Sequence, residues 1–101
     1  MLEFELSDTV RQWLYELRDI RGKARILARI RSAELGNFGD CAPISEGVSE
    51  MRIHIGPGYR LYYAQRDKVV YVLLAGGDKS SQSRDIKKAI EMNRDIRKAA
   101  K

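Results

Sequence analysis

The sequence is short of the residues that support metal and disulfide chemistry. Its 101 residues include one cysteine and one histidine. A single cysteine excludes an internal disulfide, and one cysteine with one histidine gives no spacing typical of a zinc site. We therefore expect a protein that carries neither a metal ion nor another cofactor.

Long hydrophobic runs are also missing. No apolar stretch approaches the roughly 20 residues that a helix needs to span a bilayer. The N-terminal residues "MLEFELSDTV" lack the basic segment and the apolar stretch of a secretory signal. The expected localisation is therefore cytoplasmic, with no membrane partner.

What the sequence does have is an ordinary globular composition with an uneven distribution of charge. Hydrophobic residues make up 44% and charged residues 33%, which favours one soluble domain over residues 1–101. The net charge is +5, and residues 18–31 hold six basic side chains against one acidic, while residues 79–101 hold eight against three. Basic segments of this kind can converge into a patch that attracts a polyanion or an acidic protein. The alternative is a set of solvated helix faces.

Three segments have the apolar spacing that is typical of helices. After an N-cap at Ser7 or Asp8, apolar residues recur at i, i+3, i+4 and i+7, which predicts a first helix. We expect Gly22 to separate it from a second helix that ends at Gly36 or Asn37. A third helix follows the last predicted strand.

The remaining segments predict strands and loops. "LEFEL" alternates apolar and acidic residues and reads as a short strand at a sheet edge, and "VVYVLLA" is apolar enough for a central strand. The predicted fold class is α+β, in the order βααβββα. An α-hairpin and a C-terminal helix pack on a mostly antiparallel four-stranded sheet. The later predicted strands cover 48–55, 59–65 and 69–75, the predicted loops cover 40–47 and "GGDKSSQS", and the last helix begins near residue 83.

The stretch "RIHIGPGYRLYY", residues 52–63, predicts a β-hairpin around Gly-Pro-Gly. Strand alternation places Arg52 and His54 on one face, and Arg60 and Tyr62 on the same face of the return strand. Arg52 and Arg60 lie about equally far from the turn, so they could be near cross-strand neighbours. Lys79 follows the next strand, whose end should lie close to the start of the return strand. Such cations could hold a phosphate, or they could be ordinary edge-strand charges that discourage aggregation.

His54 is the one histidine of the chain. An imidazole is the side chain best suited to proton transfer near neutral pH. A lone histidine on a strand is more often structural, and only the company of Arg52 and Arg60 makes His54 a candidate for chemistry.

Four stretches together resemble the RelE/HigB-type toxins, in the branch known as addiction-module killer proteins. They are "WLYELRDIRGKARILARI", "LGNFGD", "GVSEMRIHIGPGYRLYY" and "VYVLLAGGDKSSQSRDIKKA", and they extend over nearly the whole chain. The resemblance implies a small βααβββα domain and the toxin role in a bacterial type II toxin-antitoxin module. It also implies ribosome-dependent, metal-independent cleavage of mRNA, in which the 2′-hydroxyl attacks the adjacent phosphate. The implied partners are an antitoxin protein that binds DNA, mRNA and the ribosome.

The resemblance also implies roles for particular residues. Arg60 matches the arginine of the family's "YR" motif, and Arg52 matches a basic residue on the preceding strand. His54 takes a position where some members have a lysine, and Lys79 matches a basic residue in the loop after the last strand. Some members carry a catalytic tyrosine near the end of the chain, where this sequence has none, which leaves His54 or Tyr62 as replacements. The expected catalytic residues are Arg52, His54, Arg60 and Lys79, and the expected RNA contacts are Arg25, Arg29, Tyr62 and Gln82.

Two other functions stay open at this stage. One is a non-catalytic module of the same fold that occupies RNA, the ribosome or a protein partner. The other is an RNase that cuts naked RNA, or an enzyme with a different target.

Overall fold

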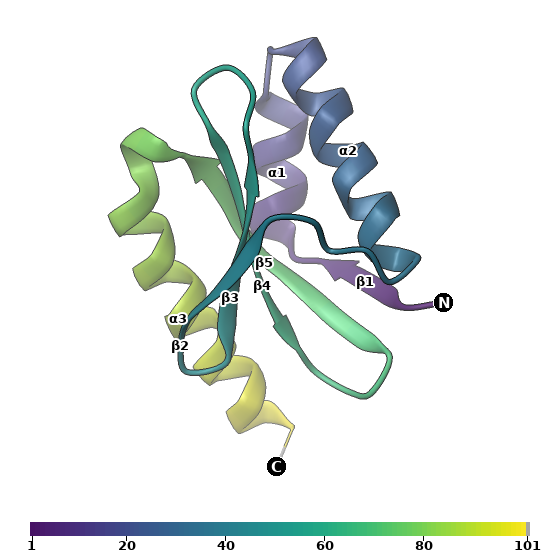
Figure 1. Cartoon of the computed structure of the whole chain (residues 1–101). Coiled ribbons are helices and arrows are strands. Elements are labelled where there is room, and N and C mark those ends of the chain that lie inside the picture. Colours follow the sequence, from purple (N-terminus) through teal and green to yellow (C-terminus); the bar gives the residue numbers. More distant parts are fainter. Residues whose placement is uncertain (101) are drawn as a thin grey trace.

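The computed structural model describes residues 1–100 and has an α+β fold in which one sheet separates two layers of helix (Figure 1). The two N-terminal helices cover one face of the sheet, and the C-terminal helix crosses the other face. No helix within these residues is both long and apolar enough to cross a membrane. The elements are β1 (Glu3–Leu6), α1 (Asp8–Glu16), α2 (Ile20–Glu34), β2 (Cys41–Ser45), β3 (Val48–Ile53), β4 (Tyr59–Gln65), β5 (Val70–Asp78), the short 3-10 helix η1 (Lys79–Ser81) and α3 (Gln82–Ala99).

The sheet has five strands, in the order β1-β5-β4-β3-β2. This corrects the predicted four-stranded sheet, because Cys41–Ser45 forms an antiparallel strand against β3 instead of a loop. The predicted order of the strands is confirmed: β1 lies at an edge, and β3, β4 and β5 are antiparallel neighbours. The predicted bounds are wrong for β3, which ends at Ile53 instead of residue 55, so His54 follows the strand. The pairing of β1 with β5 is parallel, so the sheet is mostly but not wholly antiparallel.

The helix boundaries follow from local capping. Ser7 is the N-cap of α1, as predicted, and its hydroxyl accepts a hydrogen bond from the Val10 N–H at 3.1 Å. The prediction for Gly22 is wrong, because α2 begins earlier, with Asp19 as its N-cap. Gly22 lies in the first turn, where an added Cβ would come 2.5 Å from the Tyr59 ring. Gly36 terminates α2 as expected, with a positive φ of 94°.

The strand β5 extends further than predicted, through the glycines that were assigned to a loop. A Cβ on Gly76 would lie 2.5 Å from Trp13 Cζ3, so the absence of a side chain lets α1 pack directly on the strand. Asp78 then ends β5 and caps η1, with its carboxylate accepting the Ser80 N–H at 2.8 Å. This capping turns the chain straight into α3, and no long loop separates the strand from the helix.

Side chains on the two faces of the sheet belong to two separate cores. Met51, Ile53 and Leu61 point toward α1 and α2 and are at most 2% exposed. Tyr62 and Leu74 point toward α3 and are fully buried. Strand alternation therefore also turns the intervening Arg52 and Arg60 toward the α3 side.

Candidate functional site

Arg52 and Arg60 are direct cross-strand partners in the antiparallel pair of β3 and β4. The sequence predicted this adjacency from their positions on either side of the turn, and the register confirms it. The two side chains differ in accessibility: that of Arg52 is 32% exposed and that of Arg60 only 11%. The cationic pair therefore has one accessible member and one that lies beneath the surface.

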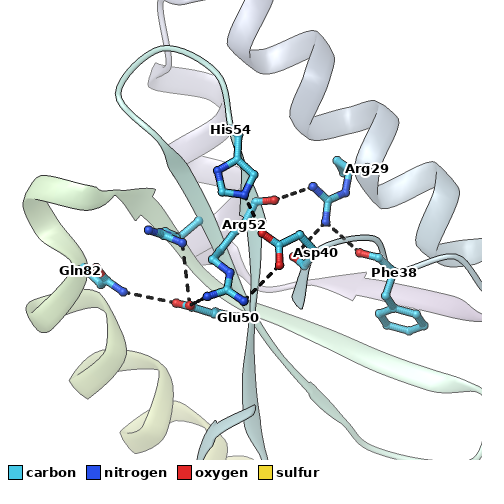
Figure 2. A network of polar contacts seen from close by, with 8 residues as sticks. Arg29, Phe38, Asp40, Glu50, Arg52, His54 and Gln82 are labelled. Carbon is cyan, nitrogen blue, oxygen red and sulfur yellow. Dashed lines mark hydrogen bonds and ion pairs between the residues drawn. The ribbon is translucent and has the colours of Figure 1, made fainter. Parts of the chain in front are cut away.

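A carboxylate of the chain itself lies between the two arginines. Glu50 Oε1 is 3.5 Å from Arg52 Nη1 and 3.8 Å from Arg60 Nη1, and Glu50 is buried. Gln82, the first residue of α3, donates its Nε2 to Glu50 Oε2 at 3.4 Å (Figure 2). Because like charges so close are unfavourable without a counter-ion, Glu50 explains how the arginine pair is tolerated.

Asp40 joins the accessible arginine to His54. Its Oδ1 accepts a hydrogen bond from Arg52 Nη2 at 3.1 Å, and its Oδ2 lies 2.6 Å from His54 Nε2 (Figure 2). The hydrogen bond with His54 and the positive charge of Arg52 lower the pKa of Asp40 below its ordinary value of 3.8. The imidazole is 67% exposed, so its other edge is open to solvent.

Arg29, one of the expected RNA contacts, is hydrogen-bonded to backbone carbonyls of the chain itself. Its Nη1 donates to the Arg52 carbonyl at 2.5 Å, and its Nη2 donates to the carbonyls of Phe38 and Asp40 at 2.8 and 3.2 Å. These bonds tie α2 to β3 and to the segment before β2 (Figure 2). Arg25, one turn earlier on α2, is exposed and remains accessible.

Tyr62 is not at an accessible surface. Its side chain is fully buried against α3, and this burial, with the charges of Glu50 and Asp85, raises its pKa to about 12. The strand face predicted for Tyr62 is confirmed, but α3 covers that face at this point. A buried ring offers no surface on which a base can stack, which corrects the expected RNA contact.

Lys79 lies close to the hairpin but is not part of the cluster. It is exposed at the start of η1, and a Cβ on Gly58 would lie 3.0 Å from Lys79 Cε, so its carbon chain packs beside the hairpin turn. Asp78, the residue before Lys79, pairs with Tyr59. The predicted proximity to the start of β4 is therefore confirmed, and the convergence of the three cations stays a prediction.

The arrangement therefore consists of two cations, an exposed imidazole and two carboxylates that hold them. Within the described part of the chain, no three His, Cys, Asp or Glu side chains are grouped so as to hold a metal ion. Such a site can bind an anion through the arginines and transfer a proton through the imidazole. The cluster consists of Asp40, Glu50, Arg52, His54, Arg60 and Gln82, and we call it the arginine–histidine cluster.

Sequence reasoning missed both carboxylates of the cluster. Glu50 precedes Arg52 by two residues on the same strand, so alternation alone places the two side chains on one face. Asp40 gave no such signal, because its position depends on the unpredicted strand β2, whose Cys41 pairs with Met51.

The fold and the cluster define a basic α+β protein with an arginine–histidine site at one end of its central hairpin. Over 88 residues the chain is 43% identical to a protein of Haemophilus influenzae described as uncharacterized, and the match covers 87% of this chain and 89% of that protein. The chain therefore belongs to the same family as this Haemophilus influenzae protein. No protein-family model and no solved structure matches the chain.

Proposed function

We propose that this chain is the toxin of a type II toxin-antitoxin module and a RelE-like mRNA endoribonuclease that acts in the cytoplasm and inhibits translation. Cleavage would be metal-independent and would take place on the ribosome. Support comes from the motif resemblance over most of the chain, from the net charge of +5, and from the arginine–histidine cluster.

The observation that carries the proposal is an exposed imidazole beside a pair of arginines with unused hydrogen-bond donors. Arg60 Nε and Nη1 and Arg52 Nε are buried and have no hydrogen-bond partner among the described residues. A buried donor without a hydrogen-bond partner destabilises the fold, and such donors are commonly found at functional sites. A phosphate oxygen is the acceptor that fits a guanidinium donor best.

In the proposed chemistry, these side chains supply the base and the cations. His54 takes the proton of a ribose 2′-hydroxyl, and the 2′-oxygen attacks the adjacent phosphorus. Arg52 and Arg60 stabilise the additional negative charge that develops on the phosphate oxygens. Outside the cluster, the exposed Lys79 and Arg25 would attract the RNA backbone.

Access to Arg60 sets a requirement on this mechanism. The residue is only 9% exposed, and Glu50 lies beside its Nη1. A phosphate would therefore reach Arg60 only by displacing the Glu50 carboxylate. In the absence of RNA, Glu50 would neutralise the arginines in the place of the substrate phosphate.

The proposed partners follow from the same function. The toxin would be held inactive by a small antitoxin that binds DNA and covers the basic surface with a partly acidic segment. The remaining partners are the mRNA and the ribosome, whose RNA would be attracted by the basic segments 18–31 and 79–100.

One observation favours a second candidate, a non-catalytic RNA- or protein-binding module of the same fold. Arg60 is paired and nearly buried, so in the described conformation it supports the hairpin instead of presenting a cation. Such a module would bind through exposed residues such as Lys79 and Arg25 and would cut no RNA.

The test is inducible expression with mapping of mRNA 5′ ends. Wild type should slow growth and produce new 5′ ends within translated regions, whereas Arg60→Ala and His54→Ala should do neither. Arg66→Ala is the matched control, because this arginine is 53% exposed after β4 and lies outside both the cluster and the two basic segments. If wild type slows growth without producing new mRNA 5′ ends, the binding module is favoured. If wild type neither slows growth nor produces new 5′ ends, the toxin proposal is overturned. Cleavage of naked RNA would indicate an RNase that does not depend on the ribosome.

A further inference from the structure

The contact between Asp40 and His54 carries an inference that rests on the proposed function. We propose that Asp40 is a positioning residue: it holds His54 in the tautomer that leaves Nδ1 free to accept the 2′-hydroxyl proton. The basis is the 2.6 Å separation of Asp40 Oδ2 from His54 Nε2, together with the open outer edge of the imidazole. Neither residue type nor spacing in the sequence pointed to Asp40.

Asp40 is fixed on several sides, as a positioning residue must be. Its backbone carbonyl accepts the Arg52 N–H at 2.9 Å and Arg29 Nη2 at 3.2 Å. Its Oδ1 accepts Arg52 Nη2 at 3.1 Å, which leaves Oδ2 for the histidine. The carboxylate is thus held by α2 and β3 while it holds an imidazole that is otherwise exposed.

The imidazole has two nitrogens, and in the neutral ring one of them donates a hydrogen bond while the other accepts one. A carboxylate only accepts hydrogen bonds, so the Nε2 that faces it carries the proton, and in the neutral ring Nδ1 is then an acceptor. Nδ1 takes the 2′-hydroxyl proton as the bond between the 2′-oxygen and phosphorus forms. The bond from phosphorus to the 5′-oxygen breaks, and that oxygen takes a proton from water. The resulting imidazolium is stabilised by the negative charge of Asp40.

The surroundings of His54 contain charges of both signs. Asp40 Oδ2 lies at hydrogen-bond distance from the ring, and Arg52 donates to the other oxygen of the same carboxylate. Asp19, the N-cap of α2, lies near the hairpin turn, since an added Cβ on Gly56 would be 3.6 Å from its Oδ2. Asp40 itself stays ionised at neutral pH, because its pKa lies below 3.8.

Asp40→Asn is the informative change, because the Arg52 donor fixes the orientation of the new side-chain amide. The amide oxygen must face the Arg52 donor, so the NH₂ group would face His54 Nε2 and force it to accept. The proton then moves to Nδ1, and the ring presents a donor where a base is required. The matched control is Asp95→Asn, which makes the same change at an exposed position on α3.

The first measurement is the ¹⁵N NMR spectrum of the imidazole, which is unambiguous because the chain has one histidine. At a pH where the ring is neutral, wild type and Asp95→Asn should show a protonated Nε2 and an unprotonated Nδ1. Asp40→Asn should show the reverse. The same tautomer mixture in all three proteins would overturn the inference, and this readout does not depend on any RNA cleavage.

The second measurement is the single-turnover rate of mRNA cleavage on the ribosome as a function of pH. Asp40→Asn should lower the maximum rate by about 100-fold, within the range for loss of a general base. An unchanged rate would overturn the inference while wild-type cleavage upholds the proposed function. If wild type cuts no RNA, the proposed function fails and the catalytic role of Asp40 fails with it.

Discussion

Glu50→Gln tests whether the buried carboxylate is what keeps the two arginines together. The change keeps the size of the side chain but removes the negative charge from between Arg52 Nη1 and Arg60 Nη1, at 3.5 and 3.8 Å. Arg52 retains Asp40 as a partner, whereas Arg60, whose side chain is 11% exposed, is left as an uncompensated charge. Removing one partner of a buried ion pair costs about 3 kcal/mol. For a domain of this size that corresponds to a fall in Tm of roughly 12–24 °C.

The assay is urea denaturation followed by circular dichroism, with Glu5→Gln as the control. Glu5 pairs with Arg66 in a contact whose side chains are 44% and 53% exposed, so its loss should change the unfolding free energy by less than about 1 kcal/mol. If both variants lose the same stability, Glu50 does not compensate the arginines and the reasoning is wrong. Under the proposed function a phosphate takes the place of Glu50, so the variant should also bind a short RNA more tightly than wild type by fluorescence anisotropy; weaker binding would contradict the exchange.

Three further predictions concern the fold that supports the cluster. Tyr59→Phe removes the hydroxyl that donates to Asp19 Oδ2 at 2.6 Å, which should cost about 1 kcal/mol in urea denaturation; no loss would mean that the bond adds nothing to the α2 cap. Gly76→Ala should destabilise by about 1–3 kcal/mol and change the fluorescence of Trp13, whose ring occupies the space of the new methyl group; an unchanged Tm would refute the close packing. The pKa values of Asp19 and Asp40 are lowered in the fold, so their contribution to stability is present above pH 3.8 and is lost as the pH falls through the lowered values. The urea midpoint should therefore fall between pH 5 and pH 2, and it should fall less in Asp40→Asn than in wild type.

The central hairpin could be predicted from the sequence because its signals are local. Alternation of apolar and polar residues fixes the faces, and a turn centred on Gly-Pro-Gly fixes which residues are opposite each other. The pairing of Arg52 with Arg60 followed from these two facts alone. The helix starting after Ser7 was equally local, since one hydroxyl and one stripe of apolar residues define it.

The strand β2 could not be found in the same way. "CAPIS" is short, carries a proline and lies at the sheet edge, where alternate side chains are only half-buried. Its apolar signal is therefore weak, and what stabilises the strand is its pairing with β3. Because β2 was not predicted, nothing in the sequence placed Asp40, which directly precedes this strand, beside Arg52 and His54.

The carboxylate between the arginines was hidden for a different reason. Strand alternation puts Glu50 on the same face as Arg52, so the sequence predicted the face to which its side chain points. From the sequence, the two arginines could hold a phosphate or be ordinary edge-strand charges, and no carboxylate of the chain was expected between them. Only the tertiary structure shows that α3 covers this face, buries Tyr62 and brings Gln82 onto Glu50.

The proposed function requires that the arginine–histidine cluster cuts mRNA on the ribosome. The most direct measurement adds purified protein to ribosomes stalled on a defined mRNA and sequences the RNA ends. The account predicts one cut in the decoding region, with a 2′,3′-cyclic phosphate on the upstream fragment and a 5′-hydroxyl on the downstream fragment. Arg60→Ala should slow the cut by about 100-fold or more, as expected for loss of a group that stabilises transition-state charge. Intact mRNA with wild-type protein, or equal cleavage by Arg60→Ala, would contradict the account.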